Sequence, residues 1–221
     1  MKPLVIFGSG ELGLLAHAYF KHEAGREVVG FTVDAAYLSH APAGPLPQVA
    51  FETLEARFPP STHELFVALG YTALNGARAA KCAEARRRGY SLASHVSPAA
   101  RTWPDLVAGD NVLVMEGALI QPFVRLGRGV VVWAGAMISH HVQVEDDCFI
   151  AAGVTLCGGV QVGRGCFVGA GAIVREGVTL APRTLVGAGA LILASTEEGH
   201  SYVVEGTRRS GIPSERMAGL L

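Results

Sequence analysis

The sequence has few of the features that mark secreted, membrane or nucleic-acid-binding proteins. Its four cysteines, Cys82, Cys148, Cys157 and Cys166, show no C-x-x-C spacing, which argues against a disulfide framework or a zinc ribbon. The formal net charge of −1 leaves no basic excess for electrostatic nucleic-acid binding. No run approaches the roughly 18 apolar residues of a membrane span, and the apolar stretch at the N-terminus is shorter than a signal-peptide core. We therefore expect a soluble, cytoplasmic protein without a bound metal.

Aromatic residues are also scarce, at 7% of 221 residues, whereas glycine occurs 28 times, a balance that favours tight turns between short strands. Residues 1–95 alternate strand-like and helix-like segments, which predicts a small parallel α/β sheet in a Rossmann-like domain. The predicted strands are 4–7, 27–33 and 64–69, and the predicted helices are 14–21 and 75–89. The proline-rich stretch 41–47 is expected to form a loop.

A six-residue repeat runs from Val114 to about Ala194. Its first phase holds only branched aliphatic residues: Val114, Ile120, Leu126, Val132, Ile138, Val144, Ile150, Leu156, Val162, Val168, Val174, Leu180, Val186 and Ile192. Its second phase, four residues later, holds small or β-branched residues: Ala118, Val124, Val130, Ala136, Val142, Cys148, Val154, Val160, Cys166, Ala172, Val178, Thr184 and Ala190. Neither an amphipathic helix nor an alternating strand produces this period.

The repeat predicts a parallel β-solenoid with three flat faces, in which each hexapeptide makes one short strand and one corner. The aliphatic residue is expected to point inward and to stack on its copy in the next coil, while the small residue fills the remaining interior space. We predict about five coils in a second domain that spans residues 96–221. Cys148 and Cys166 occupy small-residue positions and are expected to be buried, reduced thiols.

The hexapeptide repeat and four further segments together resemble a known family. The segments are residues 7–10, 67–70, 97–98 and the closing segment 211–217. The chain resembles the left-handed β-helix acyltransferases, in particular the sugar acetyltransferases of the sialic-acid O-acetyltransferase, bacillosamine N-acetyltransferase and perosamine N-acetyltransferase type. The resemblance implies a homotrimer that binds acetyl-CoA between neighbouring β-helices and transfers the acetyl group to an amino or hydroxyl group of a sugar. It also implies that the N-terminal domain holds the nucleotide of a nucleotide sugar.

Two adjacent histidines interrupt the repeat. His140 and His141 fall on the two corner positions of one hexapeptide, where they are expected to point out of the solenoid. The resemblance places the catalytic histidine at the first position, so it implies that His140 is the general base, a role for which histidine is the commonest side chain. The other interpretation is a merely polar corner. His141 is expected to orient His140 or to bind the acceptor.

The acids that follow lie one corner further along the chain. Glu145, Asp146 and Asp147 belong to a different edge of the predicted prism, so we do not expect them to pair with His140 within one chain. Relatives often carry a second histidine at the position of Phe149, where it contacts the acetyl group, and another at the position of Leu12. The chain departs from the family at both positions.

The remaining site residues follow from the same resemblance. It assigns Gly153, Gly158, Ala170 and Gly171 to acetyl-CoA, although glycines at these positions are equally expected simply to turn corners. The pattern Gly8-x-Gly10-x-x-Gly13 follows a predicted strand and opens a predicted helix, as a nucleotide-binding loop requires. The resemblance assigns Gly8, Ser9, Gly10 and Asp34 to a UDP- or dTDP-sugar, with Gly70 bordering the same cleft. Trp133 is expected either to stack on the sugar or base or to lie at a trimer seam.

These observations lead to one main hypothesis and three alternatives. The main one is an acetyl-CoA-dependent acetyltransferase that acts on the amino group of a nucleotide-linked amino sugar in surface glycan synthesis. O-acetylation of a sugar hydroxyl is its close variant, since the same base serves both. A non-catalytic scaffold that binds a nucleotide sugar is the second alternative. A metal-dependent lyase on the same solenoid is disfavoured because it needs three histidines per zinc and the repeat offers only His140 and His141.

Overall fold

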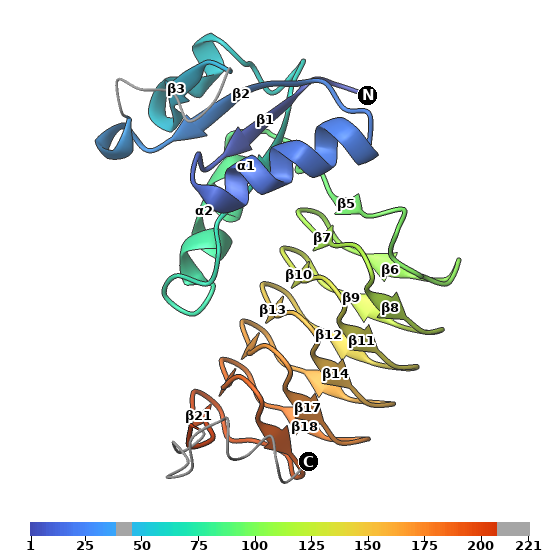
Figure 1. Cartoon of the computed structure of the whole chain (residues 1–221). Coiled ribbons are helices and arrows are strands. Elements are labelled where there is room, and N and C mark those ends of the chain that lie inside the picture. The colour runs from blue at the N-terminus through green and yellow to red at the C-terminus, as the bar shows by residue number, and fades with distance from the viewer. Residues whose placement is uncertain (39–45, 207–221) are drawn as a thin grey trace, which may run out of the picture.

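A computed structural model shows an N-terminal α/β domain seated on one end of a β-helix, whose coils stack away from it towards the C-terminus (Figure 1). The structure describes residues 1–38 and 46–206. The closing segment 211–217 and most of the proline-rich loop lie outside the described residues. Among the described residues, no helix has the length and hydrophobicity that a membrane span requires.

The N-terminal domain is built on a parallel sheet in the order β3-β2-β1-β4. Its strands are β1 (Leu4–Phe7), β2 (Val28–Val33), β3 (Gln48–Ala50) and β4 (Glu64–Val67). Its helices are α1 (Glu11–Ala18), the π-helical turn η1 (Tyr19–Glu23), the short 3-10 helices η2 (Ala35–Tyr37) and η3 (Phe51–Ala56), and α2 (Gly76–Arg87). The predicted strands are confirmed, but β3 was not foreseen. Helix α1 begins three residues earlier than predicted, directly after Gly10.

The two long helices cover opposite faces of this sheet, because successive strand side chains alternate between the faces. Leu4 and Ile6 of β1 pack with Ala16 of α1 in one core cluster. Val5 and Phe7 of the same strand pack with α2 in another. Strands β1 and β4 are parallel neighbours, so the loop that joins β1 to α1 and the loop that leaves β4 meet at one edge of the sheet. This edge lies next to the β-helix.

The second domain is the predicted left-handed β-helix, with two-residue strands on three parallel faces. Face 1 contains β5 (His95–Val96), β7 (Leu113–Val114), β10 (Val131–Val132), β13 (Phe149–Ile150), β16 (Phe167–Val168), β19 (Leu185–Val186) and β21 (Ser201–Tyr202). Face 2 contains β8 (Leu119–Ile120), β11 (Met137–Ile138), β14 (Thr155–Leu156), β17 (Ile173–Val174) and β20 (Leu191–Ile192). Face 3 contains β6 (Val107–Ala108), β9 (Arg125–Leu126), β12 (Gln143–Val144), β15 (Gln161–Val162) and β18 (Thr179–Leu180).

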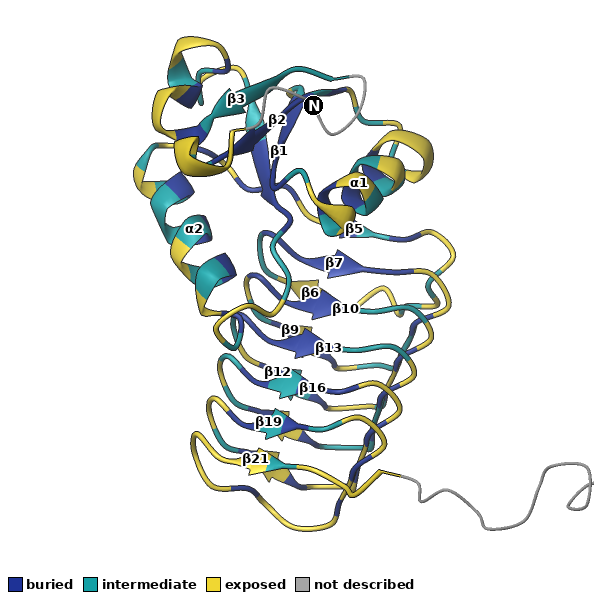
Figure 2. Cartoon of the chain, turned by 60° about the vertical axis from the view of Figure 1, so that its left-hand side comes forward, coloured by how far each residue is buried: buried dark blue, intermediate teal, exposed yellow. Residues whose placement is uncertain are grey.

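Both phases of the repeat fill the interior of the helix, as predicted. Every aliphatic residue of the first phase and every small residue of the second is buried. The register repeats every eighteen residues, so that Val131 pairs with Phe149 and Val132 with Ile150. Cys148 and Cys166 are buried free thiols, and each lies 3.1 Å from a carbonyl oxygen of a neighbouring coil. In Figure 2 the face 1 strands β7, β10 and β13 are coloured as buried, whereas many corners are coloured as exposed.

The second residue of each corner adopts a left-handed backbone conformation. Glycine occupies this position at many corners, for example Gly135 with φ 69° and Gly153 with φ 64°. Side chains occupy it at others, including Phe123 (φ 65°), His141 (φ 61°) and Asp147 (φ 63°). Because non-glycine residues adopt this region only at a cost of about 1 kcal/mol or more, a side chain at such a corner needs a compensating interaction or a function.

Arg78 of α2 ties the two domains together. Its side chain is fully buried, and its guanidinium donates hydrogen bonds to five backbone carbonyls. Two of these carbonyls belong to the loop after β4, at Leu69 and Gly70, and three belong to β-helix residues Gly129, Asp147 and Cys148. Burial lowers the pKa of this guanidinium from its ordinary value.

Two buried asparagines strengthen the junction. The Asn111 side chain exchanges two hydrogen bonds with the backbone of Val67, at 2.7 and 3.1 Å. The Asn75 amide donates to the carbonyls of Gly165 and Cys166, at 3.2 and 3.0 Å. The side chains of Arg78, Asn75 and Asn111 all hydrogen-bond to backbone groups across the junction, so they fix the position of the N-terminal domain on face 1.

Replacing Arg78 by methionine should destabilise the protein by about 3 kcal/mol or more, because several buried carbonyls lose their donor together. The urea midpoint measured by circular dichroism tests this. Arg87→Met is the matched control on the same helix, since Arg87 is exposed and should change stability by less than about 0.5 kcal/mol. Equal midpoints for the two variants would contradict the role assigned to Arg78.

Candidate functional site

His140 and His141 lie on the edge between faces 2 and 3, between β11 and β12, and both side chains are exposed. The prediction that they occupy a corner and point outward is confirmed. This edge is the one opposite face 1, on which the N-terminal domain sits. The two histidines are therefore separated by the body of the β-helix from the predicted nucleotide-binding residues of their own chain.

Gly158, at the same corner one coil further on, makes room for the His140 ring. A Cβ atom on Gly158 would lie 2.6 Å from Cε1 and 2.9 Å from Nε2 of His140. The backbone of Gly158 is not left-handed, so the close approach of the imidazole, and not turn geometry, accounts for this glycine. The structure thus links Gly158, predicted to contact acetyl-CoA, directly to His140.

The other contacts of His140 are hydrogen bonds with His141 and Gln121. Its Nδ1 lies 3.2 Å from Nδ1 of His141, and its backbone N–H donates to Oε1 of Gln121 at 2.9 Å. His141 packs in turn on the Phe123 ring, with 4.7 Å between the ring centroids. One Nδ1 atom of the pair must carry the proton that bridges them. If His140 carries it, Nε2 of His140 is left unprotonated and able to accept a proton.

The neighbouring acids have other partners, as expected from their place on the next edge. Asp146 forms an ion pair with Arg128 at 2.7 Å, and Asp147 forms one with Arg164 at 2.9 Å. Burial acts to raise the pKa of Asp146, but its hydrogen bonds with Arg128 outweigh this and hold the pKa below its ordinary range. Among the described residues, neither His140 nor His141 forms an ion pair with a carboxylate.

The other three residues predicted to bind acetyl-CoA lie on a different edge, between faces 1 and 2. Gly153, Ala170 and Gly171 are all exposed there. Gly153 and Gly171 have left-handed backbones, and a Cβ on either would meet nothing within 4 Å. The corner geometry explains both glycines. It also leaves a strip of this edge with little side-chain bulk.

The loop after β1 has the form predicted from its glycines. Gly8 has φ 101°, and a Cβ there would lie 2.7 Å from the carbonyl oxygen of Ala68. A Cβ on Gly13 would lie 2.0 Å from the carbonyl oxygen of Gly8, so both glycines are needed for strand and helix to pack. Gly10, in contrast, faces open space at the start of α1. Ser9 accepts a hydrogen bond from Gln48 of β3, whose buried Oε1 has no partner.

Asp34 lies at the end of β2, as predicted, but its carboxylate already has a partner. Nζ of Lys81 lies 2.6 Å from Oδ1 of Asp34 and 2.9 Å from Glu84. Desolvation acts to lower the pKa of Lys81, but its hydrogen bonds with the two acids outweigh this and raise it. The ion pair joins β2 to α2, so Asp34 contacts the helix on the far side of the sheet from α1.

Gly70 and Trp133 lie close together. Both line a pocket of about 250 Å³ between α1 and face 1, together with Leu12, Leu15 and Tyr71. Phe149 and Glu11 complete its wall. Trp133 stacks on Phe149 with 5.5 Å between the ring centroids. The sequence interpretation assigned Gly70 and Trp133 to the nucleotide-sugar site, which stays a prediction, and it assigned no function to Glu11 or Tyr71.

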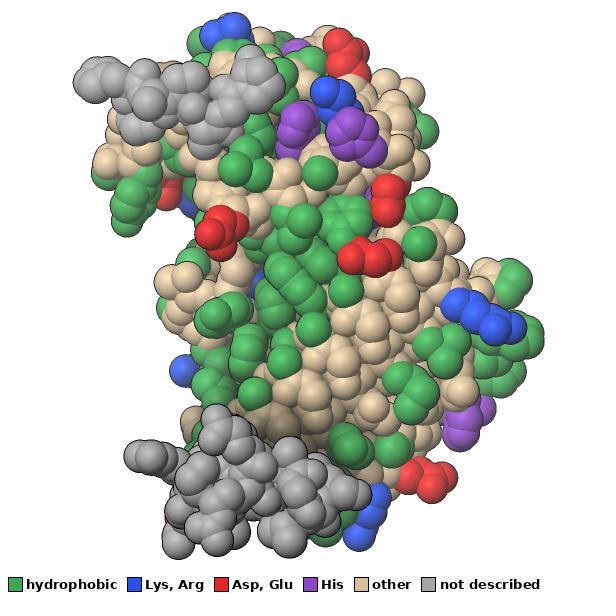
Figure 3. All heavy atoms as spheres, viewed as in Figure 1, with side chains coloured by type: hydrophobic (Ala, Val, Ile, Leu, Met, Phe, Trp, Pro, Cys, Tyr) green, Lys and Arg blue, Asp and Glu red, His purple; other side chains and the backbone are tan. Residues whose placement is uncertain are grey.

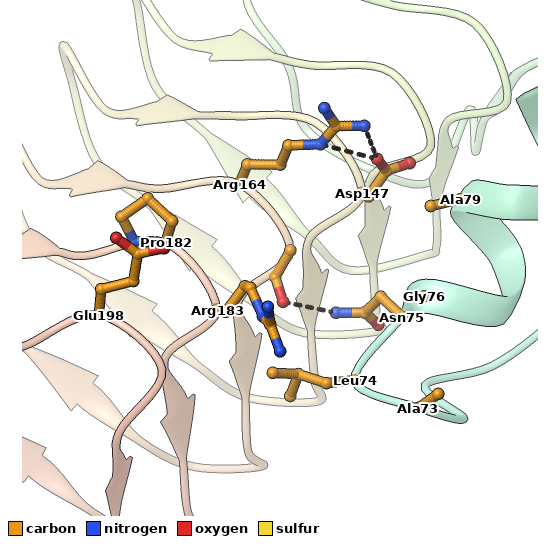
Figure 4. A pocket seen from close by; sticks show the side chains of 11 residues that line it. Ala73, Leu74, Asn75, Gly76, Ala79, Asp147, Arg164, Pro182, Arg183 and Glu198 are labelled. Carbon is orange, nitrogen blue, oxygen red and sulfur yellow. Dashed lines mark hydrogen bonds and ion pairs between the residues drawn. The ribbon is translucent and has the colours of Figure 1, made fainter.

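A larger cavity, of about 430 Å³, lies on the edge between faces 3 and 1, beside the start of α2. Figure 4 shows Arg164 against Asp147 and the Asn75 amide directed at a carbonyl of the β-helix. None of the predicted site residues lines this cavity. Its polar side chains are those of Asn75, Asp147, Arg164, Arg183 and Glu198.

A metal site has no basis in the described part of the chain. No three His, Cys, Asp or Glu side chains gather closely enough there to hold a metal ion.

Comparisons with known proteins agree with the architecture. Residues 141–175 match the bacterial transferase hexapeptide family (six repeats), and residues 159–194 match the hexapeptide repeat of succinyl-transferase. Among curated protein sequences, none matches the chain significantly.

Solved structures match nearly the whole chain. A complex of PerB from Caulobacter crescentus with CoA and GDP-perosamine is 26% identical, with a TM-score of 0.81 over 92% of this chain and 95% of that one. The acetyltransferase domain of PglB from Neisseria gonorrhoeae is 24% identical, with a TM-score of 0.82 over 92% and 97% of the two chains. WeeI from Acinetobacter baumannii shares the fold at 16% identity, with a TM-score of 0.63 over 92% and 97%.

Replacing Gly158 by alanine should displace the His140 ring, because the new Cβ would overlap Cε1. The NMR signal of the His140 Cε1 proton is expected to shift, while that of the exposed His22 stays in place. Gly76→Ala is the control, since a Cβ there meets only Ala73 Cβ at 3.8 Å. An unchanged His140 signal in Gly158→Ala would show that the imidazole does not lie over Gly158.

Proposed function

We propose that this chain, a hexapeptide-repeat acyltransferase of the bacillosamine and perosamine N-acetyltransferase type, transfers the acetyl group of acetyl-CoA to the amino group of a nucleotide-linked amino sugar. The observation that carries the proposal is the His140 imidazole, exposed on an edge of the β-helix and seated over Gly158. PerB, which shares 26% identity across the two domains, holds CoA and GDP-perosamine.

In this proposal His140 is the general base. With the proton of the histidine pair on Nδ1 of His140, Nε2 accepts a proton from the sugar amine as its nitrogen attacks the thioester carbonyl. The C–N bond forms, the tetrahedral intermediate collapses, and the C–S bond breaks. The imidazolium then returns the proton to the departing CoA thiolate. His141 supports this cycle by fixing the tautomer and the ring orientation of His140.

Acetyl-CoA is proposed to lie along the edge between faces 1 and 2. Gly153, Ala170 and Gly171 are exposed there, and a Cβ on either glycine would point into open space. A long pantetheine arm can approach the backbone closely at such residues, so that its amides reach backbone hydrogen-bonding groups. The nucleotide of a UDP- or dTDP-sugar is proposed to lie at the loop of Gly8, Ser9 and Gly10, next to Gly70.

A second copy of the chain is needed to complete this site. His140 lies on the edge opposite face 1, whereas Gly70 and Trp133 lie where face 1 meets the N-terminal domain. The His140 edge of one subunit must therefore meet face 1 of its neighbour. Exposed apolar side chains on face 2, Met137, Ile173 and Leu191, offer a surface for such packing. We propose a homotrimer, in which this heterologous contact closes into a ring.

The proposed reaction is tested by thiol release from acetyl-CoA in the presence of UDP-, dTDP- and GDP-linked amino sugars. One acceptor should give turnover, and His140→Ala should lower kcat/KM at least about 100-fold, as loss of a general base does. His22→Ala, an exposed histidine of η1, is the control and should keep full activity. Absence of thiol release with every amino sugar would refute the N-acetyltransferase proposal.

Mixing two inactive variants tests the shared active site. His140→Ala and Trp133→Ala should each be inactive alone, since the first lacks the base and the second lacks a pocket wall. Refolded together, they should regain about a quarter of the active sites, because random assortment around a ring joins an intact edge to an intact pocket that often. Activity no higher than that of the separate variants would show that each subunit works alone.

A further inference from the structure

We propose that Arg125, on face 3 of one subunit, supplies the positive charge that binds the diphosphate of a nucleotide held by the N-terminal domain of the neighbouring subunit. This inference rests on the proposed function and its homotrimer, and it adds a substrate-binding residue to the shared site. The hexapeptide repeat gives Arg125 only an outward position at the start of β9.

A cavity of about 420 Å³ lies on face 3 beside the histidine edge. His141 and Phe123 line it from the edge, and Arg125 and Val107 line it from the face. Because Nδ1 of His141 lies 3.2 Å from Nδ1 of His140, the cavity adjoins the proposed general base. Figure 3 shows a histidine side chain at the right-hand edge of the β-helix, with basic and hydrophobic side chains next to it on the side of the N-terminal domain.

The other two polar side chains of the cavity hold the corner at Phe123. Oδ2 of Asp105 accepts a hydrogen bond from the Phe123 backbone N–H at 2.7 Å, and Nε2 of Gln143 donates to the Phe123 carbonyl at 3.3 Å. These bonds help to offset the left-handed backbone of Phe123, whose ring remains 59% exposed. Arg125, in contrast, forms no ion pair with any described residue.

Arg125 is also the one charged residue in its column of described strands. The outward residues that begin successive strands of face 3 lie in register: Val107, Arg125, Gln143, Gln161 and Thr179. The other coils therefore fold with an uncharged residue at this position, so the β-helix does not need the guanidinium. A guanidinium without a partner suits an anionic ligand, because its planar set of donors matches the oxygens of a phosphate.

The proposed nucleotide-binding edge of the N-terminal domain is acidic. Glu11 begins α1, Asp34 follows β2, and Glu52 accepts a hydrogen bond from the residue after Asp34. Lys81 is already paired with Asp34. Among the described residues, no lysine or arginine hydrogen-bonds to residues 8–10, and none lines the adjoining pocket. A diphosphate on this loop therefore needs a cation from another chain to balance its charge.

The proposed homotrimer brings Arg125 to that edge. The histidine edge separates face 2, which packs inside the ring, from face 3, which then forms one wall of the crevice between two subunits. The neighbour supplies the other wall, with face 1 and the start of α1, because the pocket of Gly70 and Trp133 lies there. Arg125 and residues 8–10 of the neighbour thus face each other across one crevice, and His140 lies beside it. One sugar nucleotide can then place its amine at the base and its diphosphate at Arg125.

Calorimetric titration measures this charge without turnover. The probes are UDP, dTDP and GDP, each beside the corresponding nucleoside, which lacks the diphosphate. Arg125→Gln is the main variant, because Gln143 and Gln161 occupy the same position in the next coils and the fold accepts glutamine there. Arg125→Lys keeps the charge. Arg87→Gln is the matched control, since Arg87 is exposed on α2 and forms no ion pair with a described residue.

At least one nucleoside diphosphate should bind more tightly than its nucleoside. Arg125→Gln should weaken binding of this diphosphate about tenfold, the scale of a charge-assisted hydrogen bond in a partly solvated site, and leave the nucleoside unchanged. Arg125→Lys should lose no more than about threefold, and Arg87→Gln should lose nothing. Unchanged diphosphate binding in Arg125→Gln, or an equal loss for the nucleoside, would overturn the assignment. Absence of binding by every diphosphate would overturn it too.

Mixed trimers show in which subunit Arg125 acts. Arg125→Gln and Trp133→Ala are refolded together, and thiol release is measured below the KM of the acceptor. If Arg125 serves the neighbour, about a quarter of the sites combine an intact Arg125 with an intact Trp133, and about a quarter of the parent activity should return. If Arg125 served its own chain, every intact Trp133 would accompany a lost Arg125. Activity would then remain near a twentieth of that of the parent, a result that contradicts the proposal.

The failure of this inference can be told apart from the failure of the proposed function. Thiol release with an acceptor KM that Arg125→Gln leaves unchanged would keep the acetyltransferase and refute the role of Arg125. Diphosphate binding that depends on Arg125, without thiol release from any acceptor, would do the reverse. A higher KM for the acceptor, with little change in kcat and an unchanged KM for acetyl-CoA, is the result expected if both hold.

Discussion

The buried guanidinium of Arg78 is the contact on which the arrangement of this protein depends. A β-helix has no natural attachment point for a globular domain, because its corners repeat along the whole stack. Arg78 supplies one by bonding at once to the loop after β4 and to carbonyls of two different coils. Asn75 and Asn111 add bonds of the same type. The loop that carries Gly70 and Tyr71 is thereby held against the aromatic column of face 1, and the pocket between the domains exists because of it.

The β-helix itself follows from a simple rule about which positions may vary. Two of every six residues are packed inside and tolerate only aliphatic or small side chains. Many corners are solvent-exposed and hold varied residues, at the cost of a left-handed backbone in the second position, whereas corners beneath α2, such as that of Asn111, are buried. His141 occupies such a position although glycine fills it at many other corners. The exposed histidines that interrupt the repeat therefore lie on an edge, and the lack of a side chain at Gly158 leaves room for the His140 imidazole.

The sequence predicted the parts of this structure that repeat or that depend on local rules. The phase of the β-helix was read correctly because many successive hexapeptides confirm one another, and β1 with its glycine loop follows from local packing needs. Strand β3 was missed because three residues after a proline-rich stretch carry no periodic signal. Arg78 looked like one of several arginines on α2, since its partners are backbone carbonyls distant in the chain. Asp34 was placed on β2 correctly, but its pairing with Lys81 depends on how α2 packs.

The eighteen-residue register has a consequence for how such a chain can change length during evolution. Adding or removing one whole coil beyond Gly171 would leave each edge aligned with itself, so His140 and Gly158 would keep their places relative to the N-terminal domain. Inserting a single hexapeptide above His140 would preserve every inward side chain and every corner, yet rotate the histidine edge by one face around the stack. The core would tolerate that insertion, while the two histidines would lie on a different edge relative to the N-terminal domain. The position of His140 around the stack therefore repeats with every whole coil, whereas the packing of the interior repeats with every hexapeptide.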